Sequence, residues 1–300
     1  MLLRRKCSSK KYRRNKMATF FNQATLTYSG GSAASNIVSG ELVEAISAIK
    51  TATTETYREG ESITYVISLI NDSDAPSSAL TVTDDLGAYT VGTQTVFPFV
   101  YRDGSAELFV NGVPTAATVV STQPLTVTGI TLPANGDAVL VYTATATEFA
   151  PPTSDGTVIN TATVTGAGIT TPITVTETVT AEGGALLAIT KEISPSTVTP
   201  NAPLTYTITV ENSGNEDVVV TDDLTVRDVF DPILDITSVT LNGVILNEGT
   251  DYTYNETTGE FTTVPGRITV PAATFAVDPV TGAYVITPGE AVLTVTGTVQ

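Results

Sequence analysis

Phe20-Phe21-Asn22-Gln23-Ala24-Thr25-Leu26-Thr27 is a strand-like stretch close to the start of the chain. A near copy, Val158-Ile159-Asn160-Thr161-Ala162-Thr163-Val164-Thr165, stands mid-chain, where a linker (182–184) soon follows. Both stretches are rich in the apolar and β-branched residues that strands favour. The mid-chain copy therefore resembles the closing strand of a domain, and the first copy resembles a closing strand placed before any domain begins.

An internal repeat extends this pattern over most of the chain. Short strand-like segments alternate with Gly-, Asn- and Asp-rich turns, which predicts an all-β sandwich or barrel. Landmarks recur in the same order: 48–51 with 189–192, 62–67 with 203–208, 82–86 with 220–224, 110–113 with 241–244, and 138–141 with 291–294. The repeat indicates a duplicated domain.

The repeated motifs resemble a known family. A Lys-bearing strand is followed by Thr-Tyr-x-Ile with an Asn-containing turn, then Val-Thr-Asp-x-Leu, then Asn-x-Ala-x-Val. This order resembles the bacterial surface-repeat family called domain of unknown function eleven, and the likeness covers nearly all of residues 20–300. The opening Met17-Ala18-Thr19-Phe20-Phe21 is similar to clostridial proteins with these modules, among which are spore-appendage subunits. The resemblance implies immunoglobulin-like modules and a surface role, and it implies no chemistry.

The second repeat contains no counterpart of 158–165. A sandwich without a terminal strand has an open edge that invites pairing with another chain. We therefore predict two tandem immunoglobulin-like β-sandwich domains, the second lacking its last strand, preceded by an N-terminal donor strand that completes the next copy. The alternative is a truncated fragment of a longer repeat protein. The predicted ranges are a basic tail (1–16), a donor segment (17–42), a first domain (43–181) and a second domain (182–300).

Strand parity predicts two clusters of inward polar residues, because side chains alternate between faces. In the first repeat Lys50, Asp84 and Asn160 are each expected on the same strand face as their apolar neighbours two residues away. In the second, Lys191 and Asp222 do so, and Asn22 does so in the donor segment together with Phe20, Ala24 and Leu26. Buried lone charges cost several kcal/mol, so these residues are expected to lie together.

Such a cluster has the groups for a spontaneous isopeptide bond. Burial favours the neutral, nucleophilic lysine amine and a protonated aspartic acid, and a fixed geometry raises the rate. We predict a Lys50–Asn160 bond promoted by Asp84, and a Lys191–Asn22 bond between subunits promoted by Asp222. The alternatives are a core ion pair capped by the asparagine, or a bond from lysine directly to aspartate.

Composition argues against an enzyme. The chain has no His, which removes the usual general base and the commonest metal ligand. Its single Cys7 excludes an internal disulfide framework and a Cys-rich zinc site. No cofactor or metal is expected. The acidic turns near Asn71 and Asn212 lack the ligand spacing of a calcium loop.

Charge is unevenly distributed. Eight of the 14 Lys and Arg residues lie in residues 1–16, which leaves 31 acidic against six basic groups, or −25, in the rest. The negative charge of residues 17–300 repels nucleic acid and anionic lipid, which are therefore disfavoured as partners. Two interpretations of the basic residues 1–16 are open: translation that really starts at Met17, or an arm that binds nucleic acid or phospholipid. No classical signal peptide or membrane span is visible in the sequence.

Together these features predict a self-assembling filament subunit on a bacterial cell or spore surface. Its partner is itself, in a head-to-tail homopolymer, with a surface anchor protein as a further candidate. The competing function is an adhesin or carbohydrate-binding module, against which the absence of Trp argues.

Overall fold

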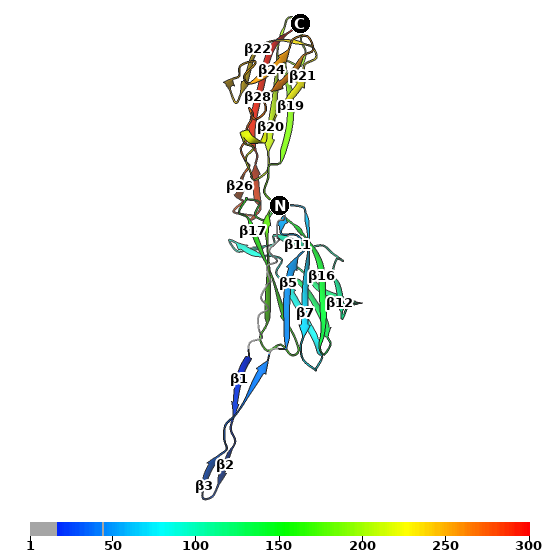
Figure 1. Cartoon of the computed structure of the whole chain (residues 1–300), viewed down its shortest axis with the longest axis vertical. Coiled ribbons are helices and arrows are strands. Elements are labelled where there is room, and N and C mark those ends of the chain that lie inside the picture. Colours follow the sequence, from blue (N-terminus) through cyan, green and yellow to red (C-terminus); the bar gives the residue numbers. More distant parts are fainter. Residues whose placement is uncertain (1–16, 44) are drawn as a thin grey trace, which may run out of the picture.

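The computed structural model describes residues 17–43 and 45–300. The basic tail predicted for residues 1–16 lies outside this part of the chain. The described residues are almost all strands and turns, with a single short 3₁₀ helix and no α-helix. The all-β prediction is confirmed. The molecule is elongated, with an N-terminal arm at one end, a first sandwich in the middle and a second sandwich at the other end (Figure 1).

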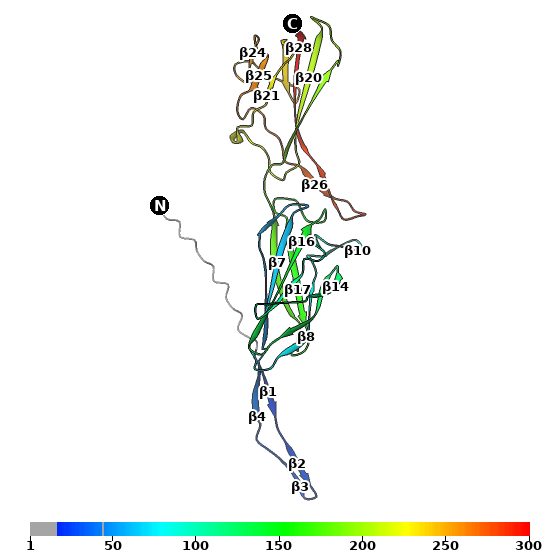
Figure 2. The ribbon, with the colours of Figure 1, turned by 90° about the vertical axis from the view of Figure 1, so that its right-hand side faces the viewer.

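The N-terminal arm, residues 17–43, is a long β-hairpin that projects from the first sandwich (Figures 1 and 2). Strand β1 (Met17–Asn22) pairs with β4 (Val38–Val43), and β2 (Thr25–Tyr28) pairs with β3 (Gly31–Ala34). The stretch 20–27, predicted as one strand, is therefore divided between β1 and β2, with a break at Gln23 and Ala24. The ladder is interrupted because Ala24 donates its N–H to Ser35 Oγ at 2.9 Å and Gln23 donates its side-chain amide to Ser35 O at 2.7 Å.

The first sandwich consists of two six-stranded sheets that enclose one hydrophobic core. One sheet has the order β13 (Val113–Thr115), β12 (Glu107–Val110), β16 (Gly136–Ala146), β7 (Ser62–Asn71), β5 (Ile46–Ala52), with β11 (Phe99–Tyr101) also paired to β16. The other has the order β14 (Thr118–Thr122), β15 (Leu125–Leu132), β8 (Ser77–Asp84), β17 (Thr157–Thr165), β18 (Ile173–Ala181), β6 (Thr56–Tyr57). A small hairpin, β9 (Tyr89–Val91) and β10 (Gln94–Val96), stands apart.

Alternation along the strands creates this core. In β7 every second residue is buried, including Ile63, Tyr65 and Ile67, while the residues between them are more exposed. The same period of two appears in β16 and β17. Such alternation is the pattern expected of a strand with one face against the core.

The second sandwich repeats part of this arrangement around its own core. Its main sheet has the order β19 (Leu187–Ser194), β20 (Pro203–Asn212), β28 (Gly289–Val299), β22 (Leu234–Leu241), β23 (Val244–Ile245). The opposing sheet contains β21 (Arg227–Val229), β25 (Glu260–Thr263) and β24 (Tyr252–Asn255). Where the first sandwich has strand β8, the second has the 3₁₀ helix η1 (Val220–Asp222).

A further hairpin of the second sandwich, β26 (Thr274–Val277) with β27 (Tyr284–Thr287), reaches back to the first sandwich (Figure 2). It stands between Pro271 and Gly289, where the repeat of the first sandwich has only the short turn before β16. Its tip is anchored by Tyr284, which donates its N–H to Glu148 O at 2.8 Å. The hairpin therefore braces the two sandwiches against each other.

Candidate functional site

A buried Lys–Asp pair lies at the centre of the first sandwich. Lys50 comes from β5 and Asp84 from β8, so the pair joins the two sheets. Lys50 Nζ lies 2.6 Å from Asp84 Oδ2, and both side chains are 0% exposed. Asp84 Oδ1 accepts a second hydrogen bond from Leu86 N at 3.1 Å. Burial lowers the pKa of Lys50, and Asp84 opposes that shift. Burial likewise raises the pKa of Asp84, against the pull of Lys50.

Asn160 enters the same buried space from β17. It sits two residues before Ala162, which pairs with Asp84 across the β17–β8 ladder, so the side chains of Asn160 and Asp84 lie on the same inner face. Asn160 is fully buried and donates its Nδ2–H to Tyr142 Oη at 3.2 Å. Its Oδ1 atom makes no hydrogen bond of good geometry among the described residues. A buried carboxamide oxygen without a partner is unusual, and it is available to a protonated acid.

Two tyrosines close this cluster, and parity reasoning missed both. Tyr65 and Tyr142 stack with ring centroids 5.5 Å apart, and Lys50 Nζ lies 4.9 Å from the Tyr65 ring. Both are completely buried, and burial raises the pKa of each phenol. The signal was present, because each tyrosine lies on the inward face of its strand. The cluster thus holds an amine, a carboxyl and a carboxamide in a buried site.

The equivalent lysine of the second sandwich has a different environment. Lys191 Nζ lies 2.5 Å from Asp228 Oδ2 and 4.2 Å from the centroid of the Tyr206 ring. Its side chain is 38% exposed, whereas that of Lys50 is 0% exposed. Asp228 has no counterpart in the sequence motif, so no sequence signal indicated it.

The predicted inward position of Asp222 is not found. Asp222 is exposed at the end of η1, where its carboxylate accepts the Val219 N–H at 2.7 Å. The parity argument assumed a strand here. In the first sandwich β8 is held in a sheet by β15 and β17, whereas the η1 segment has only an isolated bridge from Val218 to Val270. Asn22, the predicted partner of Lys191, is exposed in the arm.

Strand β19 presents an uncovered apolar face. It pairs with β20 alone, and all eight of its residues are exposed. On the face shared with Lys191, Leu187 is 44%, Ile189 61% and Ile193 44% exposed. The counterpart of Leu187 in the first sandwich, Ile46, is only 6% exposed, because β18 packs across β5. No described strand packs on β19 in that way.

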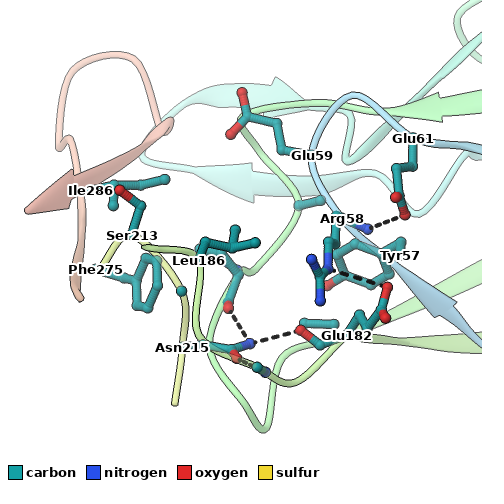
Figure 3. Close-up of a pocket in the computed structure, with 15 residues that line it drawn as sticks. Tyr57, Arg58, Glu59, Glu61, Glu182, Leu186, Ser213, Asn215, Phe275 and Ile286 are labelled. Atoms are coloured by element: carbon teal, nitrogen blue, oxygen red, sulfur yellow. Dashed lines mark hydrogen bonds and ion pairs between the residues drawn. The ribbon is translucent and has the colours of Figure 1, made fainter. Parts of the chain in front are cut away.

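A cavity of about 300 Å³ lies where the two sandwiches meet (Figure 3). Its rim carries an ion pair between Arg58 Nε and Glu182 Oε2 at 3.2 Å. Asn215 of the second sandwich donates to Pro152 O at 2.9 Å and to Glu182 O at 3.1 Å. The apolar part is lined by Leu186, Phe275 and Ile286 among others. These contacts fix the junction between the sandwiches.

The acidic turns use their asparagines as structural residues. Asn71 Oδ1 accepts hydrogen bonds from Ser73 N and Oγ, and Asn212 Oδ1 accepts from Leu186 N and Gly214 N. Within residues 17–43 and 45–300, no group of three potential metal ligands occurs. In the same part of the chain, no helix has the length and apolarity that crossing a membrane requires.

Comparison with known proteins gives likenesses of architecture only. No family model matches the sequence, and no curated protein matches it. Among solved structures, the chain resembles the group B streptococcus pilus 2b backbone protein (14% identity, TM-score 0.36, 55% of this chain and 76% of that one). It also resembles BcpA, the major pilin subunit of Bacillus cereus (11% identity, TM-score 0.34, 90% of this chain and 73% of that one). A third likeness is to a family 123 glycoside hydrolase from Clostridium perfringens (12% identity, TM-score 0.28, 46% of this chain). The chain spans only 27% of the length of that protein.

Proposed function

We propose that this protein is a structural, self-assembling subunit of a bacterial surface or spore-appendage filament. Copies join head to tail when the N-terminal segment of one copy completes the second sandwich of the next. The observation that carries this proposal is the exposed inner face of β19, whose counterpart in the first sandwich is covered by β18. Fully burying Leu187, Ile189 or Ile193 is worth about 1.5–3 kcal/mol each.

The arm supplies a matching donor. Phe20, Phe21 and Leu26 are 56%, 70% and 64% exposed. The arm therefore carries large apolar side chains that are not part of the core of its own sandwich. Its stretch 20–27 has the pattern of β17, including an asparagine at the same place. Strand addition of this kind combines main-chain hydrogen bonds with side-chain pockets. Repetition of a contact that does not close on itself produces a filament. The resemblance to the surface-repeat family agrees with this role.

The buried cluster of the first sandwich has the groups for an isopeptide bond between Lys50 and Asn160. The Lys50 amine attacks Cγ of Asn160, a new C–N bond forms, and the Cγ–Nδ2 bond breaks. Asp84 accepts one proton from the Lys50 ammonium, relays another from the attacking nitrogen to the departing Nδ2, and ends protonated. Ammonia leaves, and a buried ion becomes part of a neutral amide. The same chemistry between Lys191 and Asn22 of the next copy would make the filament covalent.

Assembly is tested by incubating the purified chain, imaging it by electron microscopy and boiling it in SDS. We expect filaments and a ladder of bands, and a chain without residues 17–43 should give neither. A chain without residues 1–16 is the matched control and should still assemble. An adhesin would stay monomeric with a single band. Filaments that form without residues 17–43 would refute donor-strand joining.

Intact mass with peptide mapping tests the bonds separately. The first sandwich should lose the mass of one ammonia at Lys50–Asn160, and Asn160→Ala should abolish that loss. A full-mass wild-type chain would exclude the intramolecular bond. A Lys191→Ala variant that still gave SDS-resistant ladders would exclude the intermolecular one.

A further inference from the structure

We propose that the donor is the whole N-terminal hairpin, and that its docking turns the η1 segment of the acceptor into a strand that carries Asp222 to Lys191. This inference rests on the proposed function. It adds that two strands are donated together, and that the second cross-linking site is assembled only by docking.

The first sandwich shows why one strand is insufficient. There β17 lies between β8 and β18, and it is β18 that packs across β5. A single donor strand in the place of β17 would pair with the η1 segment and leave β19 still open. Only a second strand in the place of β18 covers Leu187, Ile189 and Ile193. The exposed face of β19 therefore requires both strands of a hairpin.

The arm has the same construction as the β17–β18 hairpin. Both are antiparallel, and in each an asparagine of the first strand pairs with the return strand: Asn160 with Glu177, and Asn22 with Val38. In each, the return strand leads directly into a lysine-bearing strand. β18 ends at Ala181 and β19 begins at Leu187, while β4 ends at Val43 and β5 begins at Ile46. A docked arm would thus connect the second sandwich of one copy to the first sandwich of the next in the way that β18 connects the two sandwiches within one chain.

The pairing of β17 with β8 predicts the register of docking. Val164 pairs with Val82, and Ala162 pairs with Asp84. The corresponding pairs are Leu26 with Val220 and Ala24 with Asp222 of the neighbouring copy. In the single chain Val220 is 63% exposed, and Asp223 adopts a left-handed conformation (φ 53°) that ends η1. The segment thus satisfies its own backbone locally while no strand lies beside it.

This rearrangement would separate docking from bond formation. Before docking, Lys191 is partly exposed and paired with Asp228. In the first sandwich, Glu177 of β18 lies close enough to Lys50 for its charge to raise the pKa of that lysine. After docking, Val38 would take the corresponding place beside Lys191. Asp222 would then occupy the place of Asp84, and Asn22 that of Asn160. The covalent step would follow only correct assembly, which avoids cross-links between misaligned copies.

Photo-crosslinking in assembled filaments tests the two-strand geometry. A benzophenone amino acid replaces Leu26 in one variant and Val38 in another, with Val244, exposed on β23, as the control position. We expect the Leu26 probe to label residues 218–224 of a neighbour and the Val38 probe to label residues 187–194. Labelling by the Leu26 probe without labelling of 187–194 by the Val38 probe would overturn the hairpin and leave single-strand donation intact. A lack of both labels and of filaments would mean that the proposed function itself fails.

Hydrogen exchange and two aspartate variants test the rearrangement. Amides 219–224 should exchange at least tenfold more slowly in filaments than in the single chain, and unchanged exchange would overturn the strand conversion. Asp222→Ala should keep filaments visible by microscopy but abolish their resistance to boiling SDS. Asp228→Ala should keep both properties. The reverse result, with SDS resistance lost in Asp228→Ala alone, would show that Asp228 and not Asp222 serves the bond.

Discussion

Replacing Lys50 with methionine tests whether the buried ion pair determines the stability of the first sandwich. The experiment is made in an Asn160→Ala background, because no Lys50–Asn160 amide can form there. Methionine fills the space of the lysine stem but leaves the fully buried Asp84 without a cation, with only neutral partners such as the Leu86 N–H and the Tyr142 side chain. Removing one member of a buried pair costs about 3–5 kcal/mol, since the other charge is left uncompensated. This is a large part of a typical stability of about 5–15 kcal/mol.

The loss should depend on pH in a defined direction. Burial already raises the pKa of Asp84 above its ordinary value of 3.8, and removing Lys50 raises it further. The folded variant then binds a proton that the unfolded chain releases above its ordinary pKa. Its stability therefore falls as pH rises through this window and returns on acidification, by about 1.4 kcal/mol per pH unit. The background protein should show the same direction of pH dependence but a smaller one, because Lys50 opposes the rise in the pKa of Asp84 there.

The assay is urea-dependent hydrogen exchange of peptides from β7 and β16, which report on the first sandwich alone. The double variant Lys50→Met/Asp84→Leu is the matched control, and it should recover to within about 1 kcal/mol of the background, because apolar residues replace both charges. The reasoning is refuted if the single variant loses less than about 1 kcal/mol near neutral pH, or if its deficit is the same at about pH 5 as at about pH 8.

Three further substitutions have predictable costs, each measured as a shift in calorimetric stability. Asn212→Ala removes a buried side chain with four hydrogen bonds and should cost the second sandwich at least about 2 kcal/mol. Phe261→Ala opens the fully buried core of the same sandwich and should cost about 3–5 kcal/mol. Gly87→Ala should cost the first sandwich at least about 1–2 kcal/mol, because Gly87 has φ +74° and a Cβ there would lie 2.3 Å from Val158 Cγ1. A loss below half of the stated value in any of them would contradict the assigned role.

Sequence periodicity predicted much of the first sandwich. Lys50 lies on β5, Asp84 on β8 and Asn160 on β17, and the alternation of apolar residues along these strands correctly placed all three on inward faces. The tyrosines at 65 and 142 follow the same alternation and could have been included. Parity is reliable here because each of these strands is held in a sheet: β8 and β17 have neighbours on both sides, and β5 pairs with β7 along its whole length.

The second site could not be read in this way, because its conformation depends on contacts that no local pattern encodes. Parity placed Asp222 inward on the assumption of a strand, but a strand needs a partner to satisfy its backbone groups. Without a full ladder the segment forms η1 and Asp222 binds its own Val219 N–H. Asp228 replaces it beside Lys191 through the fold of β21, which has no equivalent in the repeated motif. The β26–β27 hairpin was unpredicted for the same reason.

The position of the arm restricts how the proposed exchange takes place. A chain could in principle fold its own 20–27 segment onto its own second sandwich. In the structure, however, the arm leaves the first sandwich at the end opposite the second sandwich (Figures 1 and 2). The junction held by Asn215 and by the Tyr284–Glu148 hydrogen bond keeps the second sandwich away from it. Self-completion would require the arm to reverse along the whole first sandwich, whereas a neighbouring copy can meet it end to end. Donation between copies therefore needs no rearrangement of the arm's direction, and a contact between opposite ends extends into a filament rather than a closed dimer.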